Sequence, residues 1–419
     1  MSAQKWVSAL VCLVAMAGIG GTTPATAAAG TTYYVDVRAG EDGNDGTSAD
    51  APWRTLDKVN DAEFAPGDTV AFRRGQEWDG ALRLSDSGTA AAPITVTAYG
   101  DDQAAPPAIG GPAATECVLI VGSRWHLTGL RATGCAWSGF EIRGSHNTLA
   151  DVHADANAAG VVIGDGAAFN TIRNSTFADN NKMSVNTPGG SDDSGAFGIL
   201  INGDDNTVTR NVITGSRAES HDYGYDGAAV EIFDGDRNRV EYTIARDNLT
   251  FAELGRGPGA TADGNLFAYN AVTSRHEGGA FLVTRGAEDV NGPVRGTTAV
   301  NNSVSLPGQD TEGWVCYAGC GPDILTLRSN VVSVGGQTGF EDGEGADEDH
   351  GIYQGSRSRF EPGPHSRHAD PLFVSDTDLR LRAGSPAIGA GAPAGYTFDL
   401  AGRPVPATGP DAGAYQFQP

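Results

Sequence analysis

The sequence predicts a parallel β-helix, an all-β solenoid whose short strands stack in successive coils, and three observations predict it. Similar segments recur along the middle of the chain, each a short apolar strand followed by a polar turn, an asparagine and alternating apolar residues. The periodicity inside each segment is two rather than 3.6, which is typical of strands and not of helices. Glycine accounts for 59 of the 419 residues, which favours many tight turns.

The first element along the chain is a candidate signal peptide over residues 1–28. Lys5 precedes an apolar run that begins at Trp6 and ends at Ile19, and small residues follow around Ala27. This layout is typical of a secretory signal with its cleavage site. A membrane anchor is the alternative, but the run is shorter than the roughly 20 residues that a spanning helix needs. We therefore expect a secreted, extracellular protein without a membrane span.

An asparagine opens each repeated segment. The shortest interval, from Asn147 to Asn170, is 23 residues, which is the length of one coil of short strands and turns. Because one coil cannot bury its own apolar face, successive coils must supply a continuous core. We expect the recurring asparagines to form a structural ladder at one corner of the stack, namely Asn147, Asn170, Asn206, Asn238 and Asn265.

Extra residues fall at one place in each of two coils. The interval is 36 residues from Asn170 to Asn206 and 32 from Asn206 to Asn238. The surplus lies in residues 181–196 and 217–227. Insertions at one corner project on one face, which is often the binding face. A WD40-type propeller is the competing architecture, but its units of about 40 residues with G-H and W-D signatures do not recur here.

Four cysteines follow the candidate signal peptide, and an oxidising compartment favours disulfides among them. Four cysteines allow three pairings, and sequence proximity favours Cys117–Cys135 with Cys316–Cys320. A metal site is the alternative, but the spacings of 18 and 4 do not form a paired C-x-x-C pattern.

The formal net charge is −24, and removing Lys5 with the signal peptide makes it −25. Lys58 and Lys182 are then the remaining lysines. Such a surface repels nucleic acid and anionic membranes. It also weighs against a strongly anionic substrate, unless the groove is locally basic or carries a metal ion. We expect a monomer that binds no nucleic acid.

Both ends of the mature chain carry stretches that are similar to a known group. YYVDVRAGEDGNDGTSADAPWRTLDKVN and APGDTVAFRRG open it, and HADPLF, SPAIGAG and PDAGAY close it. With these stretches the sequence resembles the secreted right-handed parallel β-helix proteins of the pectate-lyase-like superfamily. The resemblance implies one single-stranded, right-handed parallel β-helix over residues 31–419. Its parts would be N-terminal coils and cap at 31–115, central coils at 116–335, and a C-terminal coil and cap at 336–419.

The resemblance leaves the reaction open. Relatives in this superfamily include polysaccharide lyases, glycoside hydrolases, epimerases and non-catalytic adhesins, so the fold alone does not define the chemistry. The chemistry must be argued from individual side chains.

Aligning the central strands as inward–outward–inward triplets places two acids side by side. The corresponding inward residues are Phe140, Val161, Ile199, Val230 and Ala252. The outward residues are Glu141, Val162, Leu200, Glu231 and Glu253. Glu231 and Glu253 are then neighbours on adjacent coils, about one strand spacing apart. Two carboxylates so close share a proton, bind a cation or meet a basic group. A solvated acidic face is the alternative.

A glycoside hydrolase is the first reaction class that fits these acids. Glu231 with Glu253 would suit a retaining pair, and either of them with Asp222 or Asp226 an inverting pair. The insert over residues 217–227 runs directly into the strand of Glu231. Its tyrosines suit the apolar faces of sugars. We expect substrate binding by His221, Tyr223, Tyr225 and His276.

A β-eliminating polysaccharide lyase is the second class. There the acids would bind Ca²⁺ and neutralise a uronate, while a basic side chain takes the α-proton. The candidate bases are Lys182, His221, His276 and Arg285. For Lys182 and the two histidines, a solvated surface position is the alternative. The resemblance favours Lys182 and Arg285, because β-helix lyases often use a lysine or arginine base beside acidic Ca²⁺ ligands.

An acidic run, EDGEGADEDH at residues 341–350, lacks the register of an EF-hand loop. We expect a solvated loop, with weak Ca²⁺ binding as the alternative. P-loop, G-x-S-x-G and H-E-x-x-H motifs do not occur in the sequence, so nucleotide hydrolysis, serine hydrolysis and zinc proteolysis have no support.

The sequence therefore predicts an extracellular carbohydrate-active enzyme that cleaves a polysaccharide. Hydrolysis is preferred over elimination because of the negative charge. A Ca²⁺-dependent polysaccharide lyase and a non-catalytic glycan-binding or cell-surface module are the alternatives. We expect no cofactor if the reaction is hydrolysis, and Ca²⁺ if it is elimination.

Overall fold

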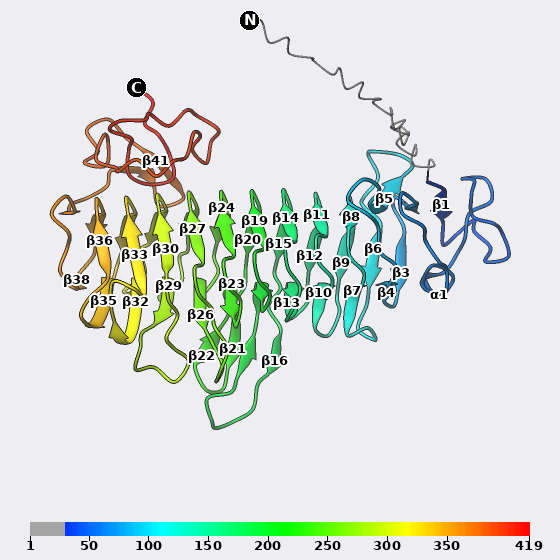
Figure 1. The fold of residues 1–419 in the computed structure, drawn as a ribbon, viewed down its shortest axis with the longest axis horizontal. Helices are drawn as coiled ribbons and strands as arrows, with labels where there is room; N and C mark the ends of the chain where they lie inside the picture. Colours follow the sequence, from blue (N-terminus) through cyan, green and yellow to red (C-terminus); the bar gives the residue numbers. More distant parts are fainter. Residues whose placement is uncertain (1–29) are drawn as a thin grey trace, which may run out of the picture.

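The computed structural model describes residues 30–419, and these residues form one continuous solenoid of three long parallel sheets with irregular segments at both ends (Figure 1). The candidate signal peptide over residues 1–28 lies outside the described residues. Each coil contributes one strand to each sheet, and every strand pair between successive coils is parallel, which confirms the predicted right-handed parallel β-helix.

Sheet A carries the first strand after each asparagine of the predicted ladder. Its twelve strands are β1 (Thr32–Val35), β2 (Thr69–Arg73), β5 (Ile94–Tyr99), β8 (Trp125–Thr128), β11 (Thr148–Ala150), β14 (Thr171–Arg173), β19 (Thr207–Thr209), β24 (Arg239–Glu241), β27 (Leu266–Ala268), β30 (Thr297–Val300), β33 (Leu325–Arg328) and β36 (Asp347–Asp349).

Sheet B follows sheet A in each coil after a short bend. Its twelve strands are β3 (Glu77–Asp79), β6 (Ala108–Gly110), β9 (Arg131–Thr133), β12 (His153–Asp155), β15 (Thr176–Ala178), β20 (Val212–Thr214), β25 (Ile244–Arg246), β28 (Ala271–Thr273), β31 (Ser303–Leu306), β34 (Val331–Val334), β37 (Ile352–Gln354) and β39 (Arg367–His368).

Sheet C holds the strands that the sequence analysis aligned as triplets. Its eleven strands are β4 (Leu82–Leu84), β7 (Glu116–Ile120), β10 (Ser138–Ile142), β13 (Ala159–Ile163), β18 (Phe197–Ile201), β23 (Ala228–Phe233), β26 (Thr250–Gly255), β29 (Gly278–Arg285), β32 (Asp310–Cys320), β35 (Gln337–Gly343) and β38 (Arg357–Arg359).

The remaining elements lie outside the three sheets. They are the short helix α1 (Leu56–Asn60) and the hairpins β16 (Met183–Val185) with β17 (Ser194–Gly195), β21 (Ala218–Ser220) with β22 (Gly224–Asp226), and β40 (Phe373–Ser375) with β41 (Asp378–Leu381). In the described part of the chain, no helix has the length and apolarity of a membrane span.

The core runs along the inside of the solenoid from coil to coil. The inward residues of the aligned triplets, from Phe140 to Ala252, are fully buried and belong to one cluster that extends from Val35 to Tyr353. Burying these rows is the main stabilising term, since each coil covers the apolar edge of its neighbour. A second cluster packs Phe373, Leu379 and Leu381 of the C-terminal segment against β34 and β37.

The predicted asparagine ladder is confirmed. The side-chain oxygen of each asparagine accepts the backbone N–H of the one before it, from Asn147 N to Asn170 Oδ1 at 2.8 Å through Asn238 N to Asn265 Oδ1 at 2.9 Å. All five side chains are buried. Their amides thus satisfy backbone groups at a bend that the sheets leave unpaired.

A second ladder, at the bend between sheets A and B, was missed by the sequence analysis. Thr243 N donates to Asn270 Oδ1, and Asn270, Asn302 and Asn330 continue the chain of bonds at 3.0 Å. The available signal was the spacing: Asn270 follows Asn265 by five residues, as Asn211 follows Asn206. Three residues of strand and one turn residue separate the two bends of a coil.

Two disulfides, Cys117–Cys135 and Cys316–Cys320, confirm the pairing that sequence proximity favours. The first lies inside the solenoid, at the bend between sheets B and C, and the second closes the end of β32. Both bonds fit an oxidising compartment.

The two insertions form antiparallel hairpins beside sheet C, as expected for loops on one face. In Figure 1, β16, β21 and β22 lie together below the central coils. Hydrogen bonds join the hairpins: Ser220 Oγ and Asp222 N both donate to Asp193 Oδ2, at 2.8 and 2.9 Å. Together they form a wall along the edge of sheet C.

The expectation of a solvated loop over residues 341–350 is wrong for most of the run, because residues 341–343 end β35 and only residues 344–346 connect it to β36. Residues 347–349 form β36, which pairs with β33, and Glu348 is buried. The acidic side chain is tolerated because it accepts hydrogen bonds from Tyr353 Oη at 3.0 Å and Ser366 Oγ at 2.7 Å.

Candidate functional site

The outward row of sheet C brings Glu231 and Glu253 together. Leu200 pairs with Glu231, Glu231 with Glu253, and Glu253 with Val283 in the parallel register. Successive residues of a strand face opposite sides, so both carboxyl groups lie on the outer face, about 4.8 Å apart at the backbone. Their neighbours Val230 and Ala252 are fully buried in the core, which prevents the register from slipping.

Arg285, at the end of β29, lies against this pair. Its Nη2 atom donates to Glu253 Oε1 at 2.7 Å, and its Nη1 atom donates to the carbonyl oxygen of Leu254. The guanidinium is only 18% exposed, so this charge-assisted bond is largely protected from water. Glu253 therefore has a positively charged hydrogen-bond partner.

Glu231 has the opposite electrostatic environment. Burial, together with the negative charges of Glu253 and Asp226, raises the pKa of Glu231 to about 8, although the charge of Arg285 works against this. At neutral pH the Glu231 carboxyl is therefore protonated while its neighbour pairs with an arginine. A carboxyl group with a raised pKa beside a second carboxyl group is an arrangement that suits general acid catalysis.

A third carboxyl group, Asp226, reaches the same place from the end of β22. Burial, opposed by a hydrogen bond from Gly227 N, and the charges of Glu253 and Asp193 together raise the pKa of Asp226 to about 6. Tyr223 joins the group: burial and nearby carboxylates raise its pKa as well. The hairpin thus contributes an acid and a phenol to the strand face, as the sequence analysis expected from its position.

A cavity of about 390 Å³ adjoins the acids on the C-terminal side. Val283, the outward residue next to Glu253, is part of its wall. Tyr225 also lines it, and the Arg217 guanidinium lies 3.2 Å from the centre of the Tyr225 ring, which holds the ring in place. Three carboxyl groups also line the cavity, those of Glu277, Asp310 and Glu312. The cavity can hold a sugar against an aromatic ring.

A larger cavity of about 500 Å³ lies between sheet A and residues 392–396 of the C-terminal segment. Arg239 and Arg328 line it together with Tyr396, and its lining holds no carboxyl group. We place the candidate site on sheet C, because there two carboxyl groups with raised pKa values, Glu231 and Asp226, lie close to a cavity.

Asp222 has a structural role, because it joins the two hairpins. Its Oδ2 atom accepts the N–H groups of Asp192 and Asp193, at 3.1 and 3.4 Å, and so joins the two hairpins. Oxygen atoms of Asp192, Asp193 and Asp222 lie within 4.8 Å of one another, which is the spacing of a Ca²⁺ site. These oxygens already accept hydrogen bonds, however, so a cation would compete with the contacts that hold the wall together.

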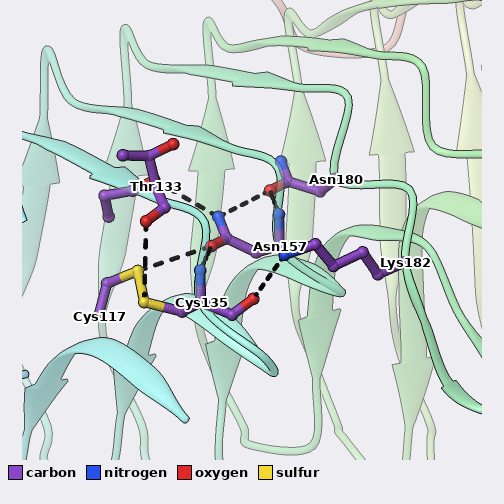
Figure 2. Close-up of a disulfide and its surroundings, with 7 residues drawn as sticks. Cys117, Thr133, Cys135, Asn157, Asn180 and Lys182 are labelled. Carbon is purple, nitrogen blue, oxygen red and sulfur yellow. Dashed lines mark hydrogen bonds between the residues drawn. A yellow bond between two sulfur atoms is a disulfide. The ribbon is translucent and has the colours of Figure 1, made fainter. Parts of the chain in front are cut away.

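Lys182 points away from the acid pair. Figure 2 shows its side chain beside the Cys117–Cys135 disulfide, with Nζ donating to the carbonyl oxygen of Cys135 at 3.1 Å. Its backbone N–H donates to Asn157, which itself bonds to Asn180. Lys182 therefore reaches toward the N-terminal coils, while Glu231 and Glu253 lie on later ones.

The two histidines lie at the margins of the site. His221 is exposed at the tip of the β21–β22 hairpin, where its N–H donates to Asn186 Oδ1 at 3.0 Å. His276 Nε2 faces the carbonyl oxygen of Asp247 at 3.1 Å, and its neighbour Glu277 lines the cavity. Neither ring contacts the acid pair.

Glu312 and Arg217 are cavity residues that the sequence analysis did not select. Burial raises the pKa of Glu312, and Gln337 Nε2 donates to its Oε1 atom at 3.1 Å. The outward row of sheet C continues from Glu253 to Val283 and Val315, so extending it does not lead to Glu312, which pairs with Ala280. Arg217 stands at the start of the second insertion, but nothing in the sequence indicates that it stacks on Tyr225.

An elongated right-handed parallel β-helix with acids on one sheet face has the fold of carbohydrate-active proteins, and the comparisons agree. The Pel9A-like right-handed β-helix region family matches residues 33–304. The chain therefore belongs to the Pel9A-like right-handed β-helix family.

One curated relative is a lacto-N-biosidase of Bifidobacterium longum subsp. longum, with 43% identity over 110 residues. The match spans 25% of this chain and 6% of the length of that relative.

Solved structures share the fold at low identity. Pectate lyase Pel9A has a TM-score of 0.61 at 18% identity, and the match covers 93% of this chain and 97% of the lyase. The GH136 lacto-N-biosidase of Eubacterium ramulus has a TM-score of 0.59 at 16% identity, covering 81% of this chain and 67% of that enzyme. The complex of XylC with xylose has a TM-score of 0.53 at 10% identity, covering 93% and 98%.

Proposed function

We propose that this protein is a secreted glycoside hydrolase that cleaves an extracellular polysaccharide with Glu231 and Glu253. The observation that supports the proposal is the pairing of a carboxyl group that is protonated at neutral pH with an adjacent carboxylate that accepts a hydrogen bond from Arg285. Glycoside hydrolysis requires these two states in two neighbouring carboxyl groups.

In the proposed reaction Glu231 is the general acid and Glu253 the nucleophile. Glu231 gives its proton to the glycosidic oxygen as that bond to the anomeric carbon breaks, and Glu253 forms a bond to the same carbon. Glu231, now ionised, takes a proton from water, and the resulting hydroxide displaces Glu253. A retaining pair stands about 5–5.5 Å apart, which adjacent strands at about 4.8 Å support.

Asp226 offers an alternative partner for the acid. It comes from the hairpin rather than from the sheet face, so a water molecule could lie between it and the sugar, as in an inverting enzyme. The stereochemistry of the released sugar distinguishes the two roles, because retention requires a nucleophile on the enzyme.

The substrate is proposed to be a neutral glycan. The cavity beside the pair contains Glu277 and Glu312, and their carboxyl groups would repel a uronate. Tyr225, held by Arg217, provides an aromatic face for a sugar ring. The short stretch of 43% identity with a lacto-N-biosidase agrees with a hydrolase.

A Ca²⁺-dependent polysaccharide lyase is the second candidate, favoured by Arg285 at the acid pair and by membership of a family named after a pectate lyase. In that reaction Arg285 would have to be neutral to take a proton, which its bond to Glu253 opposes. The acids of residues 192, 193 and 222 would be the candidate Ca²⁺ ligands.

The test is incubation of the mature protein with neutral and uronate polysaccharides, with and without Ca²⁺. Reducing ends without the absorbance of an unsaturated uronate would support hydrolysis, and both signals together elimination. Glu231→Gln and Glu253→Gln should each lower the rate at least about 100-fold. Glu141→Gln is the matched control, since Glu141 lies on the same outward row and pairs with Arg143 at 2.6 Å.

A non-catalytic glycan-binding module would give a different result. It would bind a polysaccharide in the panel without releasing any reducing ends, and the Glu231→Gln and Glu253→Gln variants would then bind as the wild type or more weakly. Turnover that persists in both variants would contradict the proposed roles.

A further inference from the structure

The last coils hold a cluster of one aspartate and two histidines that takes no part in the proposed function. Asp349 ends β36, His350 lies in the turn to β37, and His365 precedes β39. Each of the three residues offers one possible ligand atom, and these atoms all lie within 4.8 Å of one another. The cluster is on the sheet A side, several coils beyond Glu231 and Glu253.

The two imidazole rings approach the same carboxylate oxygen. His365 Nδ1 lies 2.8 Å from Asp349 Oδ2, and His350 Nδ1 lies 3.3 Å from it. The rings are stacked, with centres 4.5 Å apart and an angle of 22° between them. Both Nδ1 atoms therefore lie near one carboxylate oxygen, although the two ring planes are close to parallel.

The other oxygen of Asp349 is already used by the backbone. Asp349 Oδ1 accepts His350 N at 2.8 Å and His365 N at 2.9 Å. These bonds fix the orientation of the carboxylate and leave Oδ2 directed at the rings. Metal-binding carboxylates are commonly oriented in this way by hydrogen bonds from outside the ligand set.

The segment of His365 is held in place independently of the cluster. Ser366 Oγ donates to the buried Glu348 at 2.7 Å, Gly363 N donates to the same carboxylate at 2.9 Å, and Gly351 N donates to Ser366 Oγ at 2.8 Å. The three ligand atoms therefore sit on a preformed scaffold rather than on a free loop.

One ring nitrogen lacks a hydrogen-bond partner among residues 30–419. His350 Nδ1 is shielded from solvent and makes no hydrogen bond of acceptable geometry, although Asp349 Oδ2 is near. A shielded nitrogen without a partner carries a desolvation cost that a bound cation would remove.

We propose that Asp349, His350 and His365 form a binding site for Zn²⁺. Two imidazole nitrogens and one carboxylate oxygen are typical Zn²⁺ ligands, whereas Ca²⁺ and Mg²⁺ prefer oxygen. With Zn²⁺ bonds of about 2.0–2.1 Å, tetrahedral ligand atoms stand about 3.3–3.4 Å apart. His350 Nδ1 already has this separation from Asp349 Oδ2. The His365 side chain, which is 62% exposed, must rotate out of the stack before both nitrogens can face one cation, and its exposure leaves room for this.

Bound Zn²⁺ would tie the turn after β36 to the segment before β39. A cation held by both stabilises the folded end of the solenoid, because it binds the native chain and not the unfolded one. The proposal depends only on these three residues, and stands whether or not Glu231 and Glu253 cleave a glycan.

The experiment is calorimetric titration of ZnCl₂ into tag-free mature protein that has been stripped with chelator. One equivalent should bind to the wild type. His365→Gln and Asp349→Asn should each weaken binding at least about tenfold. His368→Gln is the matched control, because that exposed histidine lies three residues away and outside the cluster, and it should bind as the wild type.

Two further measurements keep the outcome clear. The melting temperatures of His365→Gln and the wild type should agree in chelator, and only that of the wild type should rise with Zn²⁺. Millimolar Ca²⁺ should leave Zn²⁺ binding unchanged. Absence of binding to the wild type, equal binding by the cluster variants, or displacement by Ca²⁺ would each overturn the proposal.

Discussion

Glu231 and Glu253 occupy paired positions of β23 and β26, and the Arg285 guanidinium donates to Glu253, 2.7 Å from its Oε1 atom. Equal backbone positions on adjacent coils thus have unequal electrostatic surroundings. The pKa of Glu231 rises to about 8 because burial and the charge of its neighbour both disfavour its ionised form. Four predictions test the roles of this pair, of the cavity beside it and of the asparagine ladder that aligns the coils.

The first prediction concerns the pH dependence of activity. A general acid must be protonated, so kcat/KM should fall as pH rises above about 8, where Glu231 loses its proton in the free enzyme. Glu141→Gln should keep this alkaline limb. Two results would exclude Glu231 as the acid. One is a kcat/KM that stays constant up to pH 10, and the other is a Glu231→Gln variant whose kcat/KM falls above pH 8 as that of the wild type does.

The second prediction concerns the pH dependence of stability. The pKa of Glu231 is about 8 in the folded chain and near its ordinary value of 4.5 in the unfolded chain, so the folded state holds the proton between these values. The contribution of Glu231 to the free energy of unfolding is fully present below about pH 4.5 and is lost as pH rises toward 8. Glu231→Gln removes the effect.

Urea unfolding of both proteins at pH 5 and pH 8 checks this linkage. The difference in unfolding free energy between Glu231→Gln and the wild type should shift in favour of the variant from pH 5 to pH 8. The corresponding difference for Glu141→Gln should be the same at both pH values. An equal difference at the two pH values would mean that the Glu231 pKa is not raised.

The third prediction concerns the aromatic wall of the cavity. Tyr225 is 42% exposed and its ring is held by Arg217, so Tyr225→Ala should remove a sugar contact without disturbing the core. We expect KM to rise about 5–30-fold, from the loss of an interaction of about 1–2 kcal/mol. Tyr34→Ala, on a distant strand of sheet A, is the control. A loss confined to kcat would contradict a binding role.

The fourth prediction concerns the asparagine ladder. Asn206→Ala would leave the buried N–H of Asn170 without the acceptor that it has at 2.9 Å, and would remove the bond from Asn206 to Asn238 at 3.0 Å. The unfolding free energy should fall by about 1–3 kcal/mol. Asn186→Ala, in the exposed hairpin, should cost less than about 0.5 kcal/mol. Equal effects in denaturant unfolding would contradict a stabilising ladder.

Much of the strand face could be predicted from residue order. Residues of a strand such as β23 alternate between the core and the surface, so the sequence assigns each of them to one side. A shift of the strand by one residue would expose Val230 and bury Glu231. The recurring asparagine then aligns one coil with the next. The adjacency of Glu231 and Glu253 follows from these two features, and so does the ladder itself.

The loops were less predictable because they have no period. Asp222 and Asp226 are four residues apart in one insertion, yet Asp222 joins two hairpins while Asp226 faces the acid pair. Lys182 was a candidate base, and its ammonium group instead donates to Cys135, which is 47 residues earlier. Both outcomes depend on hydrogen bonds between segments that are distant in the sequence.

By itself, the sequence determined the β-helix, its inward and outward rows, the ladder and the two disulfide pairs, because each of these repeats along the chain or joins near neighbours. The tertiary structure decided which charges meet: Arg285 with Glu253, Asp226 with both glutamates, and His365 with Asp349 and His350. The physical reason is that burial and pairing set the protonation of an acid or the ligands of a metal, and both depend on side chains brought together from different coils.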